Sequence, residues 1–177
     1  MKVRNPDIKT LELIEEFFLP DMLRTNLDQW RGLDVLYHEP RVERVWAPLE
    51  LQYSSYRVSL HVIHQTDSEK CLFHPHPWPS AMRIVKGGYE MGIGYGAGLE
   101  TPPMACKVIL AAGSSYEMND SDGWHYVNPT EETSLSVMVS GKPWGREMPV
   151  EPGHGTNREM APEEIEAILR MFREFYV

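Results

Sequence analysis

The stretch CLFHPHPWPS, residues 71–80, places two histidines one residue apart with prolines beside both. Side chains alternate between the two faces of an extended chain, so the imidazoles of His74 and His76 point to the same side. Proline fixes φ and stiffens the backbone around them. Two convergent imidazoles bind a metal ion only weakly, and a third protein ligand is needed. The pattern therefore predicts part of a metal site.

A third imidazole is available in SDGWHYVNP, residues 121–129. His125 follows a tight turn at Asp122-Gly123 and lies on a predicted strand. We therefore predict that His74, His76 and His125 bind a divalent metal ion. The alternative is that they are three ordinary polar residues at the mouth of a β-barrel.

The middle of the chain has the pattern of short strands. Tyr56, Val58, Leu60 and Val62 alternate with more polar neighbours, as in a half-buried strand. Residues 81–96 predict two strands about Gly87-Gly88, a pair that suits a two-residue turn. Further short strands are predicted over residues 107–113, 124–127 and 134–141. Many short strands without intervening helices indicate an antiparallel sandwich or barrel.

The predicted hairpin also determines which side chains accompany the histidines. Continuing the alternation from His76 places Ser80, Met82 and Ile84 on the histidine face. Pairing across Gly87-Gly88 would then place Met91 opposite Ile84. The expected surroundings of the metal site are therefore mostly apolar.

Both ends of the chain have helical patterns. At the N-terminus Asn5 is a predicted N-cap before Pro6, and apolar residues recur at helical spacing until Pro20. At the C-terminus Pro162 is predicted to open a helix with one apolar stripe. The predicted organisation is a helical extension over 1–47, a β-barrel over 48–146, and a loop and helix over 147–177 that pack on the barrel. Alternatively, one helical stripe could form a homodimer contact.

Composition narrows the class of partner. The net charge is −9, and the sequence has no cluster of Lys and Arg, which argues against nucleic-acid binding. No apolar run approaches the roughly 20 residues that span a bilayer, and the first residues lack the apolar region of a signal peptide. Cys71 and Cys106 are far apart and favour reduced thiols. We therefore expect a cytoplasmic protein whose partner is a small molecule.

The two histidine segments resemble the two motifs of the cupin superfamily. HPHPWPSAMRIVKG resembles the first motif, H-x-H-x3-E-x6-G, with His74, His76 and Gly87 in place and Ser80 where the glutamate is expected. GSSYEMNDSDGWHYVN resembles the second, with His125 as the ligand, although the usual proline is missing. The resemblance covers roughly residues 48–146. It implies an antiparallel jelly-roll barrel, a double-stranded β-helix, with the metal between three histidines.

Without the glutamate, the expected ligand set is similar to the three-histidine pattern of cupin thiol, diketone and gentisate-type dioxygenases. The layout of the two segments looks most like that of cysteine dioxygenase. That family's Ser-x-His-x-Tyr triad is replaced by Ser134, Ser136 and Met138. Three neutral imidazoles leave the metal's charge uncompensated and positions vacant for an anionic chelating substrate and O2. The prediction is an Fe(II) dioxygenase. The alternatives are a non-oxidative isomerase, lyase or hydrolase with Zn, Mn or Ni, and a binding module without catalysis.

Three further residues are predicted to take part in catalysis. Arg57 is the expected cation for an anionic substrate, because Arg83 falls on the face opposite His74 and His76. Ser80 occupies the carboxylate position, and Tyr126, like Tyr53 and Tyr56, could supply a hydroxyl near the metal. Surface exposure of the arginine and plain strand packing of the tyrosines are the alternatives.

Four other polar residues of the same region are predicted to lie outside the site. His61 and His64 are expected to be structural, Glu90 to lie on the outer face, and His154 to lie in a loop.

Overall fold

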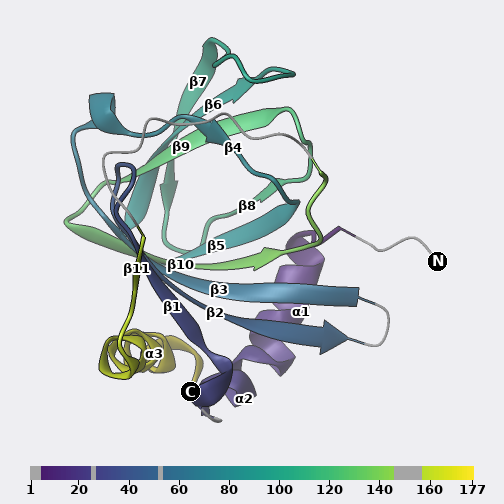
Figure 1. Ribbon diagram of the computed structural model, residues 1–177, viewed down its shortest axis with the longest axis vertical. Coiled ribbons are helices and arrows are strands. Elements are labelled where there is room, and N and C mark those ends of the chain that lie inside the picture. Colours follow the sequence, from purple (N-terminus) through teal and green to yellow (C-terminus); the bar gives the residue numbers. More distant parts are fainter. Residues whose placement is uncertain (1–4, 25–26, 52–53, 146–156) are drawn as a thin grey trace.

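The computed structural model describes residues 5–24, 27–51, 54–145 and 157–177, which form two antiparallel sheets and a layer of helices (Figure 1). The helices are α1 (Ile8–Phe17), α2 (Leu19–Arg24) and α3 (Pro162–Tyr176), with 3₁₀ turns η1 (Leu27–Gln29) and η2 (Ser68–Lys70). The strands are β1 (Arg31–Val35), β2 (Val42–Leu51), β3 (Ser54–His64), β4 (His74–Pro75), β5 (Ser80–Lys86), β6 (Gly88–Tyr95), β7 (Met104–Ala111), β8 (Ser115–Met118), β9 (Gly123–Pro129), β10 (Thr133–Ser140) and β11 (Arg158–Glu159).

The strands are divided between a seven-stranded and a four-stranded sheet. The larger sheet has the order β11-β1-β2-β3-β10-β5-β8 and the smaller one the order β4-β9-β6-β7. The prediction of a mainly antiparallel β protein with terminal helices is confirmed. The described strands form two separate sheets, and no closed barrel is seen among them.

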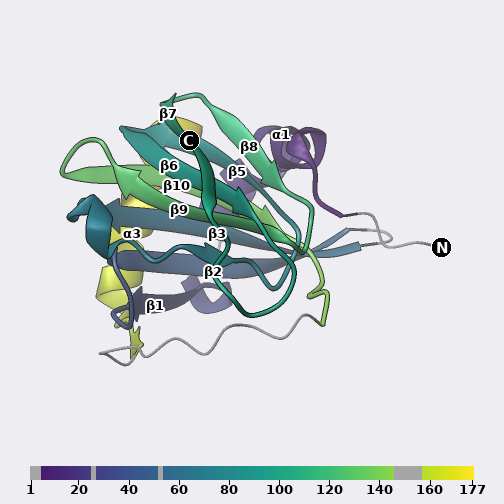
Figure 2. The same cartoon turned by 90° about the horizontal axis from the view of Figure 1, so that it is seen from above.

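Both faces of the larger sheet are covered. On β3, Val58, Leu60 and Val62 face the helices and share a buried cluster with residues of α1 and α3. The next residue, Ile63, faces the smaller sheet and packs with Ile84. Figure 2, seen from above, shows β9 and β6 stacked against the side of the large sheet that α3 does not cover. Strand β3 is therefore buried without interruption from Val58 to Ile63, which its sequence alternation alone would not require.

The helical extension is shorter than predicted. Helix α2 ends at Arg24, and β1 begins at Arg31, so residues 31–47 belong to the large sheet. The predicted boundary at residue 47 is wrong because Glu43 and Arg44 obscure the strand pattern of β2. Val45 and Ala47 nevertheless alternate with Arg44 and Trp46, and both are fully buried.

The predicted hairpin at Gly87-Gly88 is also wrong. Strand β5 pairs with β10 and β8, whereas β6 pairs with β7 and β9, so Ile84 and Met91 are not cross-strand partners. Gly87, at φ +76°, carries the chain from one sheet to the other. A Cβ there would lie 2.7 Å from Ser134 Oγ, so the corner requires glycine for both space and conformation.

The helix termini follow the expected chemistry with one shift. The N-cap of α1 is Asp7, not Asn5, and its carboxylate accepts the backbone N–H of Thr10 at 2.7 Å. Helix α3 begins at Pro162 as predicted. None of the described helices combines the length and the apolar character needed to traverse a bilayer.

A buried carboxylate ties the helical layer to the large sheet. Glu15 of α1, only 8% exposed, accepts hydrogen bonds from Arg83 Nε at 2.7 Å and from the Tyr176 hydroxyl at 2.6 Å. Arg83 therefore lies on the helix side of β5, opposite the histidines, as the alternation predicted. One acidic side chain joins α1, β5 and α3.

We predict that Glu15→Ala lowers the free energy of unfolding by about 2 kcal/mol, because it leaves the half-buried Arg83 guanidinium without its main partner. Urea unfolding followed by far-UV circular dichroism measures the change. Glu16→Ala, at the exposed neighbouring position, is the matched control and should cost less than about 0.5 kcal/mol. Equal effects of the two substitutions would contradict the role assigned to Glu15.

Candidate metal centre

The structure brings together the three predicted metal ligands. Strand β4 pairs with β9 so that His74 lies directly opposite His125, and His76 follows immediately after β4. The Nε2 atoms of His76 and His125 are 3.0 Å apart, and one nitrogen from each of the three rings lies within 4.8 Å of the others. Antiparallel register therefore joins two segments separated by about fifty positions in the chain.

Hydrogen bonds to the other ring nitrogens hold two of these imidazoles. His74 Nδ1 donates to the Leu72 carbonyl at 3.0 Å, and His76 Nδ1 hydrogen-bonds Ser80 Oγ at 3.2 Å. A histidine held through Nδ1 presents Nε2 to a metal ion. Ser80, at the position where the glutamate was expected, therefore positions His76.

The proline-rich segment is fixed from its other side. The Pro77 carbonyl accepts the N–H of Trp144, and the Pro79 carbonyl accepts that of Gly141, both at 2.9 Å. Proline lacks an N–H, but its carbonyl still bonds. The segment carrying His74 and His76 is thus attached to β9 on one side and to the chain after β10 on the other.

All three imidazoles are held in the neutral form. Burial lowers the pKa of His74, and burial together with the neighbouring imidazoles lowers the pKa of His76 and His125 well below 6.5. His38, whose ring stacks 5.9 Å from that of His74, has its pKa lowered to about 4, first by burial and then by His74. Neutral imidazole is the form that binds metal ions.

This donor set fits a divalent cation. Metal–nitrogen bonds of about 2.1 Å that meet at a right angle place two nitrogens about 3.0 Å apart, which is the separation of His76 Nε2 and His125 Nε2. In the described part of the chain, no Asp, Glu or Cys joins the group. The set is therefore three neutral nitrogens with the remaining positions open.

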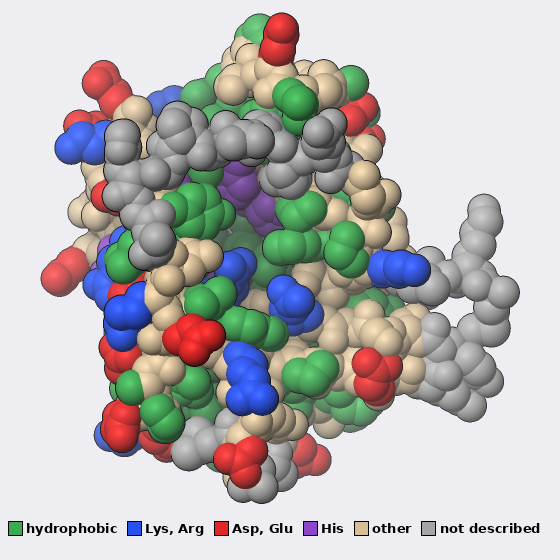
Figure 3. All heavy atoms as spheres, in the orientation of Figure 1, with side chains coloured by type: hydrophobic (Ala, Val, Ile, Leu, Met, Phe, Trp, Pro, Cys, Tyr) green, Lys and Arg blue, Asp and Glu red, His purple; other side chains and the backbone are tan. Residues whose placement is uncertain are grey.

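The histidines line a cavity of about 390 Å³ between the two sheets, a volume within the range of small-molecule sites. Its walls include Val42, Ile63, Met82 and Met138. In Figure 3 histidine side chains lie at the bottom of a hollow bordered by hydrophobic side chains, with basic side chains on one side. The expected apolar surroundings are present.

Two cavity residues were missed or misread in the sequence. Arg44 of β2 and His61 of β3 face each other in the sheet register, and both line the cavity. Burial lowers the pKa of His61 to about 3 and that of the Arg44 guanidinium below its ordinary value. A signal was present, because the alternation that directs Val58, Leu60 and Val62 to one face directs His61 to the other.

The predicted catalytic residues other than Ser80 lie elsewhere. The Arg57 guanidinium lies 5.7 Å from the Trp46 ring centroid and 5.9 Å from that of Trp78, in a neighbouring hollow. The Tyr126 hydroxyl donates to Glu90 at 2.6 Å, on the side of β9 away from His125. Neither residue lines the histidine cavity.

Two of the remaining candidates lie away from the cavity. Tyr56 packs in the helix-side core, and His64 forms a hydrogen bond with Glu43 at 2.8 Å. Tyr53 and His154 lie outside the described residues. Tyr37 and Tyr116 both line the cavity, and the ring centroid of Tyr116 is 6.1 Å from that of His125. Burial raises the pKa of the Tyr116 hydroxyl well above 10.

No family model and no curated protein matches this sequence. Among solved structures, the Fe(II) form of HppE is similar with a TM-score of 0.47 and 13% identity over 66% of this chain and 58% of that chain. The hydroxypropylphosphonic acid epoxidase from S. wedmorenis is similar with a TM-score of 0.46 and 15% identity, over 66% of this chain and 57% of that chain. The similarity spans less than two thirds of either protein's length and does not identify the activity of this one.

We predict that Ser80→Ala weakens binding of a divalent metal by about 10- to 100-fold, because His76 loses the partner that orients its ring. Titration with Co(II), followed by its visible absorption, measures the affinity. Ser55→Ala, at an exposed position of β3, is the control and should bind like the wild type. Unchanged affinity in Ser80→Ala would show that His76 does not need this hydrogen bond.

Burial of His61 predicts a loss of stability in acid. The unfolded chain binds a proton near pH 6.5, whereas folded His61 does so only near pH 3, so stability falls as the pH drops between these values. Between pH 7 and pH 5, the free energy of unfolding of His61→Asn should therefore fall by about 2 kcal/mol less than that of the wild type. Urea unfolding at both pH values tests this. The same loss in both proteins would contradict it.

Proposed function

We propose that this protein is a cupin-type metal enzyme, an Fe(II)-dependent dioxygenase that acts on a small anionic substrate. The observation that carries the proposal is the convergence of three neutral imidazoles without a carboxylate in the described ligand group. A carboxylate ligand would offset part of the charge of a divalent ion. Here that role falls to the substrate, which supports an anionic one.

The residues of this chain have distinct tasks in such an enzyme. His74, His76 and His125 would hold the ion, and Fe(II) bound there supplies Lewis acidity and redox chemistry with O2. The Leu72 carbonyl and Ser80 Oγ keep the rings of His74 and His76 in the binding orientation. No proton has to leave these rings before binding, because burial already holds them neutral.

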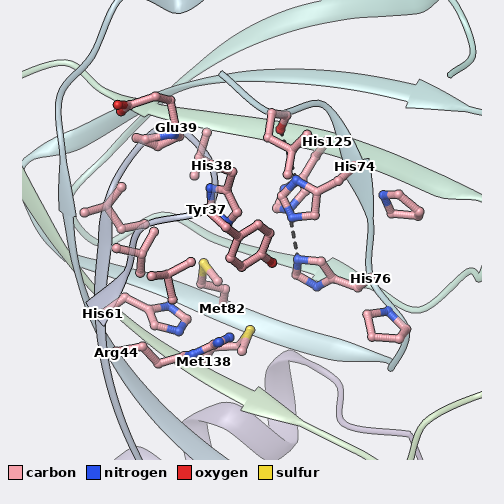
Figure 4. Close-up of a pocket in the computed structure, with 18 of the residues that line it drawn as sticks. Tyr37, His38, Glu39, Arg44, His61, His74, His76, Met82, His125 and Met138 are labelled. Carbon is pink, nitrogen blue, oxygen red and sulfur yellow. Dashed lines mark hydrogen bonds between the residues drawn. The ribbon is translucent and has the colours of Figure 1, made fainter. Parts of the chain in front are cut away.

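The cavity walls near this centre are largely apolar. Met82, Met138 and Val127 present apolar surface toward the histidines (Figure 4 labels the two methionines). The Tyr116 hydroxyl donates to Met82 Sδ at 2.8 Å, and burial keeps it protonated. A protonated hydroxyl can donate to an anionic substrate that approaches His125, but it cannot serve as a base near neutral pH.

A non-oxidative reaction of the isomerase, lyase or hydrolase type, with Zn, Mn or Ni, is the second candidate. The observation that favours it is His38, a neutral imidazole that lines the same cavity next to His74. Such a group can accept a proton from a substrate whose carbonyl or water is polarised by the metal.

We expect the protein loaded anaerobically with Fe(II) to retain about one ion per chain and to consume O2 with a thiol, a β-diketone or a hydroxybenzoate. His125→Ala should lose both properties, and His64→Ala, outside the cavity, should keep them. Iron and O2 are measured by elemental analysis and an oxygen electrode. Full iron occupancy without O2 uptake on any of these compounds would overturn the dioxygenase proposal.

Metal analysis of protein purified without added metal separates the remaining alternatives. Zinc or nickel together with turnover independent of O2 would favour the non-oxidative enzyme. Failure to bind any divalent metal would leave a small-molecule-binding protein without metal catalysis.

A further inference from the structure

We propose that Arg44 binds a carboxylate of the substrate, at the side of the cavity away from the three histidines. The substrate would then be a short carboxylic acid whose metal-binding group is separated from the carboxylate by an apolar spacer. This inference rests on the proposed metal function and specifies the substrate class of the same cavity.

Arg44 is a cation that has no counterion among the described residues. It lines the cavity, and within the described part of the chain it has no ion pair and no hydrogen bond through its guanidinium. The other arginine of β2, Arg41, illustrates the usual arrangement, since it forms a two-point ion pair with Asp34 at 2.8 and 2.9 Å. A half-buried guanidinium is costly unless a partner compensates its lost hydration. An anionic ligand would supply that partner.

The surroundings of Arg44 leave its charge available to a ligand. His61, its cross-strand neighbour, is buried and neutral. Glu39 is the one acidic residue among the described residues that line the cavity, and its side chain points away from both Arg44 and the histidines in Figure 4. Burial lowers the pKa of Arg44, Tyr37 opposes that effect, and repulsion from Arg57, which lies beyond Trp78, lowers the pKa further. Among the described residues that line the cavity, Arg44 is therefore the one uncompensated cation.

The positions of the two charged ends set the shape of the ligand. Figure 4 shows Arg44 and His61 on one side of the cavity and the three histidines on the other, with Tyr37 and Met82 between them. A ligand that reaches both sides must pass the Tyr37 ring and Met82, which favours methylene groups in its middle. The planar guanidinium matches a carboxylate through two parallel hydrogen bonds.

The test uses full-length protein loaded with Co(II), whose visible spectrum reports the metal and its ligands. The probes are 3-mercaptopropanoate and 4-mercaptobutanoate, each compared with its uncharged primary amide. We expect the wild type to bind at least one acid more tightly than its amide. Arg44→Met should weaken the binding of that acid by about 10- to 100-fold, the usual effect of losing a hydrogen-bonded charge. It should leave the affinity for the amides unchanged.

Two matched variants separate charge from geometry and from position. Arg44→Lys keeps the charge but cannot form the two parallel hydrogen bonds of a guanidinium, so its affinity for the acid should lie between those of Arg44→Met and the wild type. Arg57→Met removes the arginine of the neighbouring hollow, which does not line the cavity, and should change acid binding much less than Arg44→Met does. Metal content measured after each titration excludes loss of Co(II) to the thiol.

The outcomes distinguish this inference from the proposed function. If Arg44→Met binds Co(II) normally and discriminates acid from amide as the wild type does, the carboxylate site is overturned and the metal function stands. If wild-type protein does not bind Co(II), the proposed function fails, and this inference fails with it. Thermal unfolding adds a readout, because Arg44→Met should melt at the same or a higher temperature once the unpaired charge is removed.

Discussion

The large sheet is covered on both faces, and the rest of the structure depends on this arrangement. On the helix side, Leu60, Val137 and Leu169 belong to one fully buried cluster. Burial at about 25 cal/mol per Å² of apolar surface makes this side the main source of stability. The opposite face carries a smaller cluster, and it can therefore accommodate His61 and Arg44 among apolar residues. Stability and chemistry are assigned to alternate residues of the same strands.

Low polarity in the cavity has two opposite effects on its titratable groups. It removes protons from the histidines, because burial disfavours the imidazolium, and it leaves them ready to bind a cation. It cannot neutralise Arg44 near physiological pH, since a guanidinium loses its proton only far above neutrality. The same environment thus yields neutral nitrogens on one side of the cavity and a retained positive charge on the other.

The histidine group was predictable because its signal is local. Spacing placed His74 and His76 on one face, and a later strand supplied His125. Helix α3 was equally predictable, since its apolar stripe and Pro162 are contiguous in sequence. Arg44 and Arg57 show where such reasoning ended, because choosing between two arginines on neighbouring strands requires the register that pairs Arg44 with His61. The sheet change at Gly87 was hidden for the same reason, since a glycine pair suits a hairpin and a corner equally well.

The anchoring of the HPHPWPS segment on both sides bears on the choice among ions. Because β9 fixes one end and the N–H groups of Gly141 and Trp144 fix the other, the nitrogens of His74 and His76 have little freedom to follow an ion of different radius. Strain from a poor match must then be taken up in longer or bent bonds to the ion itself. If these histidines hold an ion, a scaffold anchored in this way would favour cations whose radius matches the spacing of the ring nitrogens, even where solution affinities rank the cations differently.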